Sequence, residues 1–109
     1  MATRSLTPEL MELVAKRFKA LAEPARLAIL SELKEGEANV GEIVERTGQS
    51  QAAVSKHLAL LNDLGFVSRR KDGVFVHYAL ADGEVLVLCD LMCSRIEDEL
   101  AARERVLSR

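Results

Sequence analysis

The stretch of residues 40–64 constrains the fold of this chain most strongly, because two helical apolar patterns flank a tight break. The break is Thr47-Gly48-Gln49, where Gly48 can adopt the left-handed conformation that a helix end needs. Ser50 follows as a good N-cap for the second helix. Apolar residues recur at helical spacing on both sides of the break: Val40, Ile43 and Val44, then Val54, Leu58 and Leu61. The stretch therefore predicts a helix-turn-helix over about residues 40–64.

The outer face of the second helix is small and polar, with a single Lys and little bulk. A DNA major groove is roughly 12 Å wide and admits one helix, whose short or bidentate side chains read base edges. An ordinary two-helix corner in a small α domain is the alternative interpretation. His57 is open to two roles, a phosphate contact or a structural hydrogen bond at the edge of the domain. The residues predicted to contact DNA from this helix are Ser50, Gln51, Ala52, Ser55, Lys56 and His57.

A β-hairpin is predicted over about residues 66–80, directly after the second helix. Residues 66–71 form a first strand, Asp72-Gly73 is a two-residue turn of the type that favours hairpins, and residues 74–80 return with β-branched and aromatic side chains. Arg69, Arg70 and Lys71 make its tip basic and are predicted to contact the DNA backbone. A helix-turn-helix followed by such a hairpin is a winged helix, so the predicted fold is mostly α with a small β-hairpin.

These motifs resemble the ArsR/SmtB family of bacterial metal- and arsenic-responsive repressors. The similarity is carried by SQAAVSKHLALLNDLGFVSRRKDGVFVHYAL at residues 50–80 and FKALAEPARLAILSEL at residues 18–33, and it covers roughly residues 10–100. The resemblance implies a repressor that binds inverted-repeat operator DNA as a homodimer. It is specific for the family and not for the ligand that is sensed.

Length and charge fit one small DNA-binding domain. A chain of 109 residues has room for one core. The formal net charge is −2, but residues 50–78 carry +2 and residues 81–109 carry −3, so the positive charge gathers where DNA is expected. The chain lacks a signal peptide and a membrane-spanning apolar run, which indicates a cytoplasmic protein without a membrane partner. Two His residues, no Gly-rich phosphate loop and no HExxH motif argue against an enzyme.

Two helices are predicted to form a dimer interface, one over about residues 8–21 and one over about residues 83–106. Thr7 and Pro8 begin the first helix, a second helix runs from Pro24 to about Glu35, and Asp82 can cap the last. Residues 85–93 are apolar almost all round, and one domain of this size cannot cover such a helix. We therefore expect a second subunit to cover these apolar residues, with the interface ending near Ile96 or Leu100.

Cys89 and Cys93 are the only cysteines and lie four residues apart, so a helix places both on one face. Two such thiolates can chelate a soft ion such as As(III), Sb(III), Cd(II), Zn(II) or Cu(I). No cofactor is otherwise required. The competing interpretation is that both cysteines are small apolar filler in the dimer seam. A disulfide across the dimer is a further possibility.

Departures from the resembled family favour a site within the last helix. The family's other ligand sets need Cys in residues 39–44, Cys in residues 24–35, or His at the last helix, where this chain has Asp82, Glu84, Arg95 and Asp98 instead. All-thiolate ligation favours As(III), and a third thiolate would come from the partner subunit or a small thiol. A redox or reactive-sulfur sensor, a protein-interaction module with structural cysteines, and a regulator without inducer are the alternatives.

Overall fold

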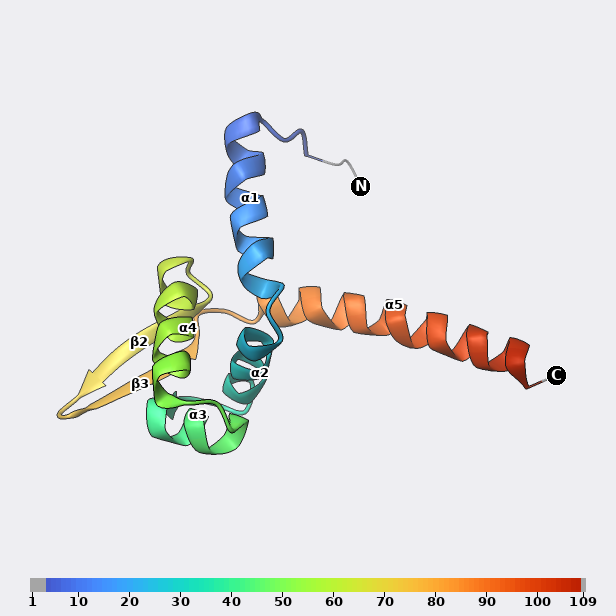
Figure 1. The fold of residues 1–109 in the computed structure, drawn as a ribbon. Coiled ribbons are helices and arrows are strands. Elements are labelled where there is room, and N and C mark those ends of the chain that lie inside the picture. Colours follow the sequence, from blue (N-terminus) through green and yellow to red (C-terminus); the bar gives the residue numbers. More distant parts are fainter. Residues whose placement is uncertain (1–3, 109) are drawn as a thin grey trace.

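Five helices and three short strands make up residues 4–108, which are the residues that the computed structural model describes (Figure 1). In chain order they are α1 (Pro8–Leu21), α2 (Pro24–Leu33), β1 (Ala38–Asn39), α3 (Val40–Thr47), α4 (Gln51–Asp63), β2 (Val67–Asp72), β3 (Phe75–Leu80) and α5 (Glu84–Leu107). The helices α2, α3 and α4 and the sheet form one head, from which α1 and α5 project in different directions (Figure 1). The arrangement confirms the predicted winged helix-turn-helix.

Local sequence signals begin and end the helices as predicted. Thr7 and Ser50 each accept a hydrogen bond from the backbone N–H three residues later, at 3.1 Å in both cases. Asn39 and Glu42 form a capping box at the start of α3, at 2.9 and 3.0 Å. Gly48 ends α3 at φ 72°, a left-handed conformation that costs glycine little. The two helices of the motif are therefore separated by a defined turn.

The core of the head lies between α2, α3, α4 and the sheet. Val54, Leu58 and Leu61 of α4 are fully buried, as the helical spacing predicts. Residues Ile29, Leu30, Leu33, Ala38, Ile43, Val67, Tyr78 and Val85 complete this cluster. Leu27 and Ala28 of α2 are exposed, because only one side of α2 faces the core.

The sheet has three antiparallel strands in the order β1-β3-β2, one strand more than the predicted hairpin. The additional strand β1 pairs Ala38 with Tyr78 and Asn39 with His77. A strand of two residues is too short for an alternating pattern, so the sequence carries no signal for it. This pairing ties the entry of the helix-turn-helix to the return strand of the wing.

Two predicted boundaries were wrong by one or two residues. The hairpin turn is Gly73-Val74 and not Asp72-Gly73, since Asp72 pairs with Phe75 and Gly73 alone of the two turn residues has a positive φ, 62°. This fits the turn type that places Gly first. Helix α2 ends at Leu33 and not near Glu35, because the N–H groups of Glu35 and Gly36 bond to carbonyl oxygens three residues back, not four.

The start of α5 also differs from the prediction. Gly83, and not Asp82, occupies the N-cap position, and no side chain caps the helix from there. The Asp82 carboxylate instead accepts a hydrogen bond from the Glu84 N–H at 2.9 Å. Asp82 therefore binds the first N–H group of α5 from the position before the N-cap.

Candidate nucleic-acid interface and thiol pair

Helix α4 is held at its N-terminus by a link to α2. The Gln49 side-chain amide donates to the Ala25 carbonyl oxygen at 2.9 Å, across 24 residues of sequence. Ser50, the next residue, is the N-cap. The turn before α4 is therefore anchored to the body of the head. Sequence reasoning placed Gln49 in the break but did not assign it this role, because its partner is a backbone carbonyl far along the chain.

The outer face of α4 is open to solvent over its N-terminal half. Gln51, Ala52, Ser55 and Lys56 are exposed, whereas His57 is only half exposed at the edge of the face. Ser50 is exposed as well. The structure thus brings together all six residues that the sequence predicts on this helix. It presents a surface of small and hydrogen-bonding side chains, which suits the major groove.

The wing divides its three basic residues between two faces of the sheet. Alternate residues of a strand share a face, so Arg69 and Lys71 project on the side of buried Val67. That side packs on the core and on α4. Arg70 projects on the opposite side, opposite His77 of β3. Arg69 and Lys71 form no ion pair with any residue among 4–108, so their charges remain available to phosphate.

Arg70 is bound to Glu37 and does not stand free at the wing. Its Nη2 and Nε lie 2.7 and 3.1 Å from the two carboxylate oxygens of Glu37. The hydrogen bond from Arg70 lowers the pKa of Glu37, and the positive charge of the Arg70 guanidinium lowers it further. The same bond raises the pKa of Arg70. Sequence reasoning missed Glu37, because nothing local indicates a pair 33 residues apart.

Cys89 and Cys93 lie on one side of α5, facing an open groove of about 350 Å³. Cys89 is half buried and Cys93 is exposed, and both are free thiols. Burial raises the pKa of the Cys89 thiol, and the neighbouring Cys93 and Asp90 raise it further. The groove is otherwise apolar and is lined by Phe18, Leu21, Ala22, Leu27, Leu88, Met92 and Ile96.

A single chain offers two thiols for a soft ion but not a complete set of ligands. Among residues 4–108, no three His, Cys, Asp or Glu side chains come close enough to form a metal site. The carboxylates at Asp82 and Glu84 lie at the start of α5, roughly one to three turns before the thiols. Any third ligand would have to come from outside this chain.

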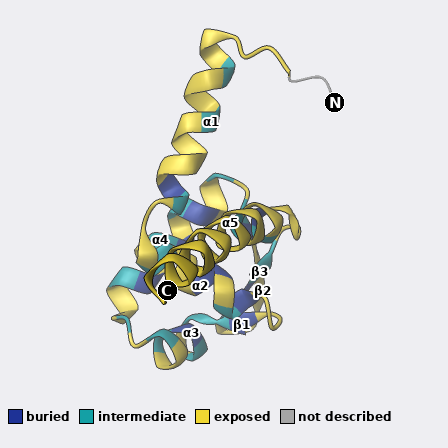
Figure 2. Cartoon of the chain, turned by 90° about the vertical axis from the view of Figure 1, so that its right-hand side faces the viewer, coloured by how far each residue is buried: buried dark blue, intermediate teal, exposed yellow. Residues whose placement is uncertain are grey.

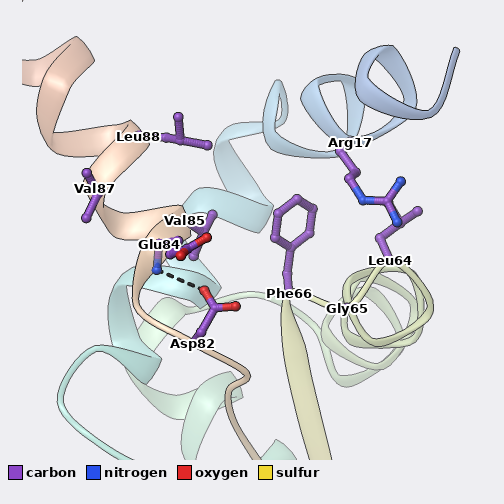
Figure 3. A pocket seen from close by; sticks show the side chains of 9 residues that line it. All are labelled: Arg17, Leu64, Gly65, Phe66, Asp82, Glu84, Val85, Val87 and Leu88. Atoms are coloured by element: carbon purple, nitrogen blue, oxygen red, sulfur yellow. Dashed lines mark hydrogen bonds between the residues drawn. The ribbon is translucent and has the colours of Figure 1, made fainter. Parts of the chain in front are cut away.

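A second groove, of about 650 Å³, opens where the start of α5 passes α1 and the end of α4 (Figure 3). The Phe66 ring stands between Arg17 of α1 and the residues Val85 and Leu88 of α5 (Figure 3). Leu88 borders both this groove and the thiol groove. The apolar surface is therefore continuous along α5, from its start to the thiol pair.

Much of α1 and α5 is exposed in the single chain (Figure 2). In α5, Leu91 and Met92 are 66% and 63% exposed, and in α1, Phe18 is 57% exposed. Such contiguous apolar surface is unusual on a monomeric protein and marks an interaction site. The other large apolar side chains exposed on these helices are Met11, Leu13, Val87, Leu88, Ile96, Leu100, Val106 and Leu107.

A first prediction concerns Arg69, whose charge lies on the opposite face of the wing from Arg70. Replacing Arg69 by Gln removes a charge that projects beside the recognition helix. Binding is expected to weaken about equally for all DNA sequences, and the slope of log K against log salt to fall by about one unit. Fluorescence anisotropy over a salt series measures both quantities. A selective loss of preference for one sequence would assign Arg69 to base recognition instead.

No helix within residues 4–108 is long and apolar enough to cross a membrane.

The family model for bacterial regulatory proteins of the arsR family matches residues 23–69, which span α2, the helix-turn-helix and the start of the wing. This match covers residues 23–33 and 50–69 of the two motifs that carry the resemblance in the sequence.

Known proteins resemble the chain beyond that segment. A probable mercury resistance operon repressor of Streptomyces lividans is 42% identical over 88 residues, 81% of this chain and 70% of the relative. The arsenical resistance operon repressor of Escherichia coli is 45% identical over 65 residues, 59% and 56% of the two chains. The solved homodimeric winged helix-turn-helix domain of a Mycobacterium bovis protein, a possible ArsR-family transcriptional regulator, is 34% identical, covers 92% and 94% of the two chains and has a TM-score of 0.77.

Fold, helix-turn-helix geometry and sequence similarity agree over most of the chain. The relatives are regulators of transcription and not enzymes, in line with the absence of a catalytic motif in the sequence. The chain belongs to the ArsR family of bacterial regulatory proteins and is a winged-helix DNA-binding regulator of transcription.

Proposed function

We propose that this protein is a homodimeric repressor that leaves its operator when Cys89 and Cys93 bind a soft metal or metalloid ion. The observation that carries the proposal is the position of the thiol pair. Both thiols face a groove that is lined by α5, α1 and α2. Two of these helices, α1 and α5, carry the large apolar side chains that are exposed in the single chain. A ligand there would act on the helices that join the two subunits.

Operator recognition is assigned to the exposed face of α4 and to the wing. Gln51 and Ser55 would contact base edges, with Lys56 beside them, and Ala52 would leave room for close approach. Arg69 and Lys71 would contact the phosphate backbone on either side of the groove. Ser50 caps the helix, and its position next to the exposed face makes it and His57 candidates for phosphate contacts.

The dimer is assigned to α1 and the first half of α5. Their exposed apolar residues would be buried between two copies of the chain, since each copy presents the same self-complementary surface. The solved relative from Mycobacterium bovis is a homodimer. Two recognition helices related by a two-fold axis would meet major grooves roughly 34–36 Å apart, so the operator is expected to be an inverted repeat. Such a protein acts on DNA in the bacterial cytoplasm.

The inducer is assigned to the class of thiophilic ions. The relatives include repressors of mercury and arsenical resistance operons, and two thiols on one helix face suit ions of this kind. For As(III), two As–S bonds would form while two hydroxide ligands leave as water with the thiol protons. Sb(III) and Cd(II) are the other candidates. The third ligand would come from the partner subunit or from a small thiol.

Oxidation of the same pair is the second candidate function, favoured by the exposure of Cys93. The raised pKa of Cys89 disfavours it, because reactive thiols are usually those with a lowered pKa. If oxidation of the pair is the signal, the protein should release DNA in response to peroxide or a persulfide donor and not in response to Cd(II).

The test is DNA binding by the full chain in the presence of inducers. The wild-type dimer should bind an inverted repeat selected from random duplex DNA, with an affinity that falls steeply with salt. Arsenite, antimonite or Cd(II) should release it, and peroxide alone should not. Binding that ignores salt, or an absence of DNA binding, would favour a protein-interaction module. DNA binding that ignores every agent would leave a regulator with packing cysteines.

A further inference from the structure

Three side chains form a row across the sheet on the face that points away from the core. Glu37 directly precedes β1, His77 is on β3 and Arg70 is on β2. His77 Nδ1 lies 3.9 Å from the same Glu37 oxygen that receives the 2.7 Å bond from Arg70. The three residues are called the wing clasp below. Each strand of the sheet, or the residue before it, contributes one member.

The contact between Glu37 and Arg70 is bidentate. Two guanidinium nitrogens meet the two carboxylate oxygens at 2.7 and 3.1 Å, and a planar fork of this kind fixes direction as well as distance. Neighbouring strands lie about 4.8 Å apart, so a link from β1 to β2 passes over the whole width of β3. It joins the start of the helix-turn-helix to the edge strand of the wing.

The wing has little else to orient its outer half. All residues of β2 after Val67 are exposed, as are Gly73, Val74 and Phe75. Strand β1 pairs with β3 only at Tyr78 and His77. The direction in which Arg69 and Lys71 project relative to α4 therefore depends on the hairpin itself and on the wing clasp.

Arg70 is also poorly placed to serve phosphate. It projects on the opposite face from Arg69 and Lys71, and a second carboxylate, that of Asp72, lies 3.9 Å from its Nη1. Two acids next to one guanidinium neutralise its charge locally. A phosphate contact from Arg70 would require it to leave both.

We propose that Arg70 is a positioning residue, which binds Glu37 so that the edge strand of the wing holds Arg69 and Lys71 against the DNA backbone while α4 lies in the groove. This role differs from the direct phosphate contact that the basic run in the sequence suggests. Glu37, an acid in a DNA-binding head, then contributes to DNA affinity through the orientation of the wing.

The two roles of Arg70 predict opposite results for Glu37→Gln. If the wing clasp positions the wing, losing the carboxylate weakens binding even though a negative charge has been removed. If Arg70 contacts phosphate, losing its competitor frees it, so binding becomes tighter and the salt slope rises. Glu45→Gln is the matched control, because Glu45 is an exposed acid of α3 that makes no ion pair among residues 4–108.

The experiment measures the affinity of full-length variants for the inverted repeat that the wild type selects from random duplex DNA, over a salt series. Glu37→Gln and Arg70→Gln should each bind about two- to fivefold more weakly with the wild-type salt slope, and Arg70→Lys should not restore binding. The double variant E37R/R70E should recover most of the loss. Arg69→Gln should lower the slope by about one unit, and Glu45→Gln should bind equally or slightly more tightly.

The proposal is overturned if Glu37→Gln binds as the wild type does or more tightly, or if Arg70→Gln lowers the salt slope by about one unit. It is also overturned if the double charge reversal fails to restore binding while circular dichroism shows a folded protein. Both residues are exposed, so their thermal unfolding midpoints should stay close to that of the wild type.

Discussion

The variant Leu88→Lys is expected to sediment as a single chain of 12.0 kDa at micromolar concentration, where the wild type sediments at twice that mass. Leu88 borders both grooves of α5 and is 46% exposed in the single chain, so a Lys there should not prevent the head from folding. In a two-fold dimer the change occurs twice. At about 2 kcal/mol for each buried apolar anchor, the dimer loses about 4 kcal/mol, or roughly a thousandfold in dissociation constant.

Operator binding should fall with the dimer, because a monomer reaches only one half-site. The control is Val106→Lys, at a more exposed apolar residue of α5 that lies beyond the predicted end of the interface near Ile96 or Leu100. This control should remain a dimer and bind DNA normally. A wild-type mass of one chain at micromolar concentration, or a dimeric Leu88→Lys, would contradict the interface. Circular dichroism of each variant separates loss of the dimer from loss of the fold.

The variants Cys89→Ser and Cys93→Ser are expected to bind operator DNA as the wild type does but to stay bound when arsenite or Cd(II) is added. In the wild type, these ions should weaken binding by about 5–150-fold, which corresponds to a coupling of roughly 1–3 kcal/mol. Ligation draws two sulfurs to one centre in a helix at the proposed dimer seam. A shift there would change the orientation of one recognition helix relative to the other.

The matched control for the thiols is Met92→Leu, an apolar change in the same groove that removes no thiol. It should keep both DNA binding and release. Because Cd(II) must displace thiol protons and burial raises the pKa of Cys89, release by Cd(II) should also become more sensitive as the pH rises. Normal release by either Ser variant, or a wild type that ignores every ion, would show that the cysteines only pack.

Local chemistry in the sequence was sufficient for most of the head. Helical spacing identified the buried residues Val54, Leu58 and Leu61, and the caps at Thr7 and Ser50 and the left-handed Gly48 marked helix ends correctly. These signals act within a few residues, so they survive without knowledge of the rest of the fold. The same holds for the hairpin, apart from a shift of one residue in its turn.

The candidate site was predictable only in part. The exposed face of α4 follows from the helical period, and the common side of Cys89 and Cys93 follows from their spacing. The groove in front of the thiols did not follow, since Phe18 and Leu27 reach it from α1 and α2. Whether a thiol on an apolar helix faces a groove or a packed core depends on how separate helices cross.

By itself, the sequence determined which segments are helical, where the helices α1 to α4 begin and which side of α4 faces the core, because those properties depend on neighbours in the chain. Only the tertiary structure decided what the charges of the wing do. The run Arg69-Arg70-Lys71 looks uniform in sequence, yet the strand alternates its faces and Glu37 lies 33 residues from Arg70. One of three similar cations is thereby bound within the protein, and the other two form no ion pair among residues 4–108, because ion pairs form between residues that the fold brings together.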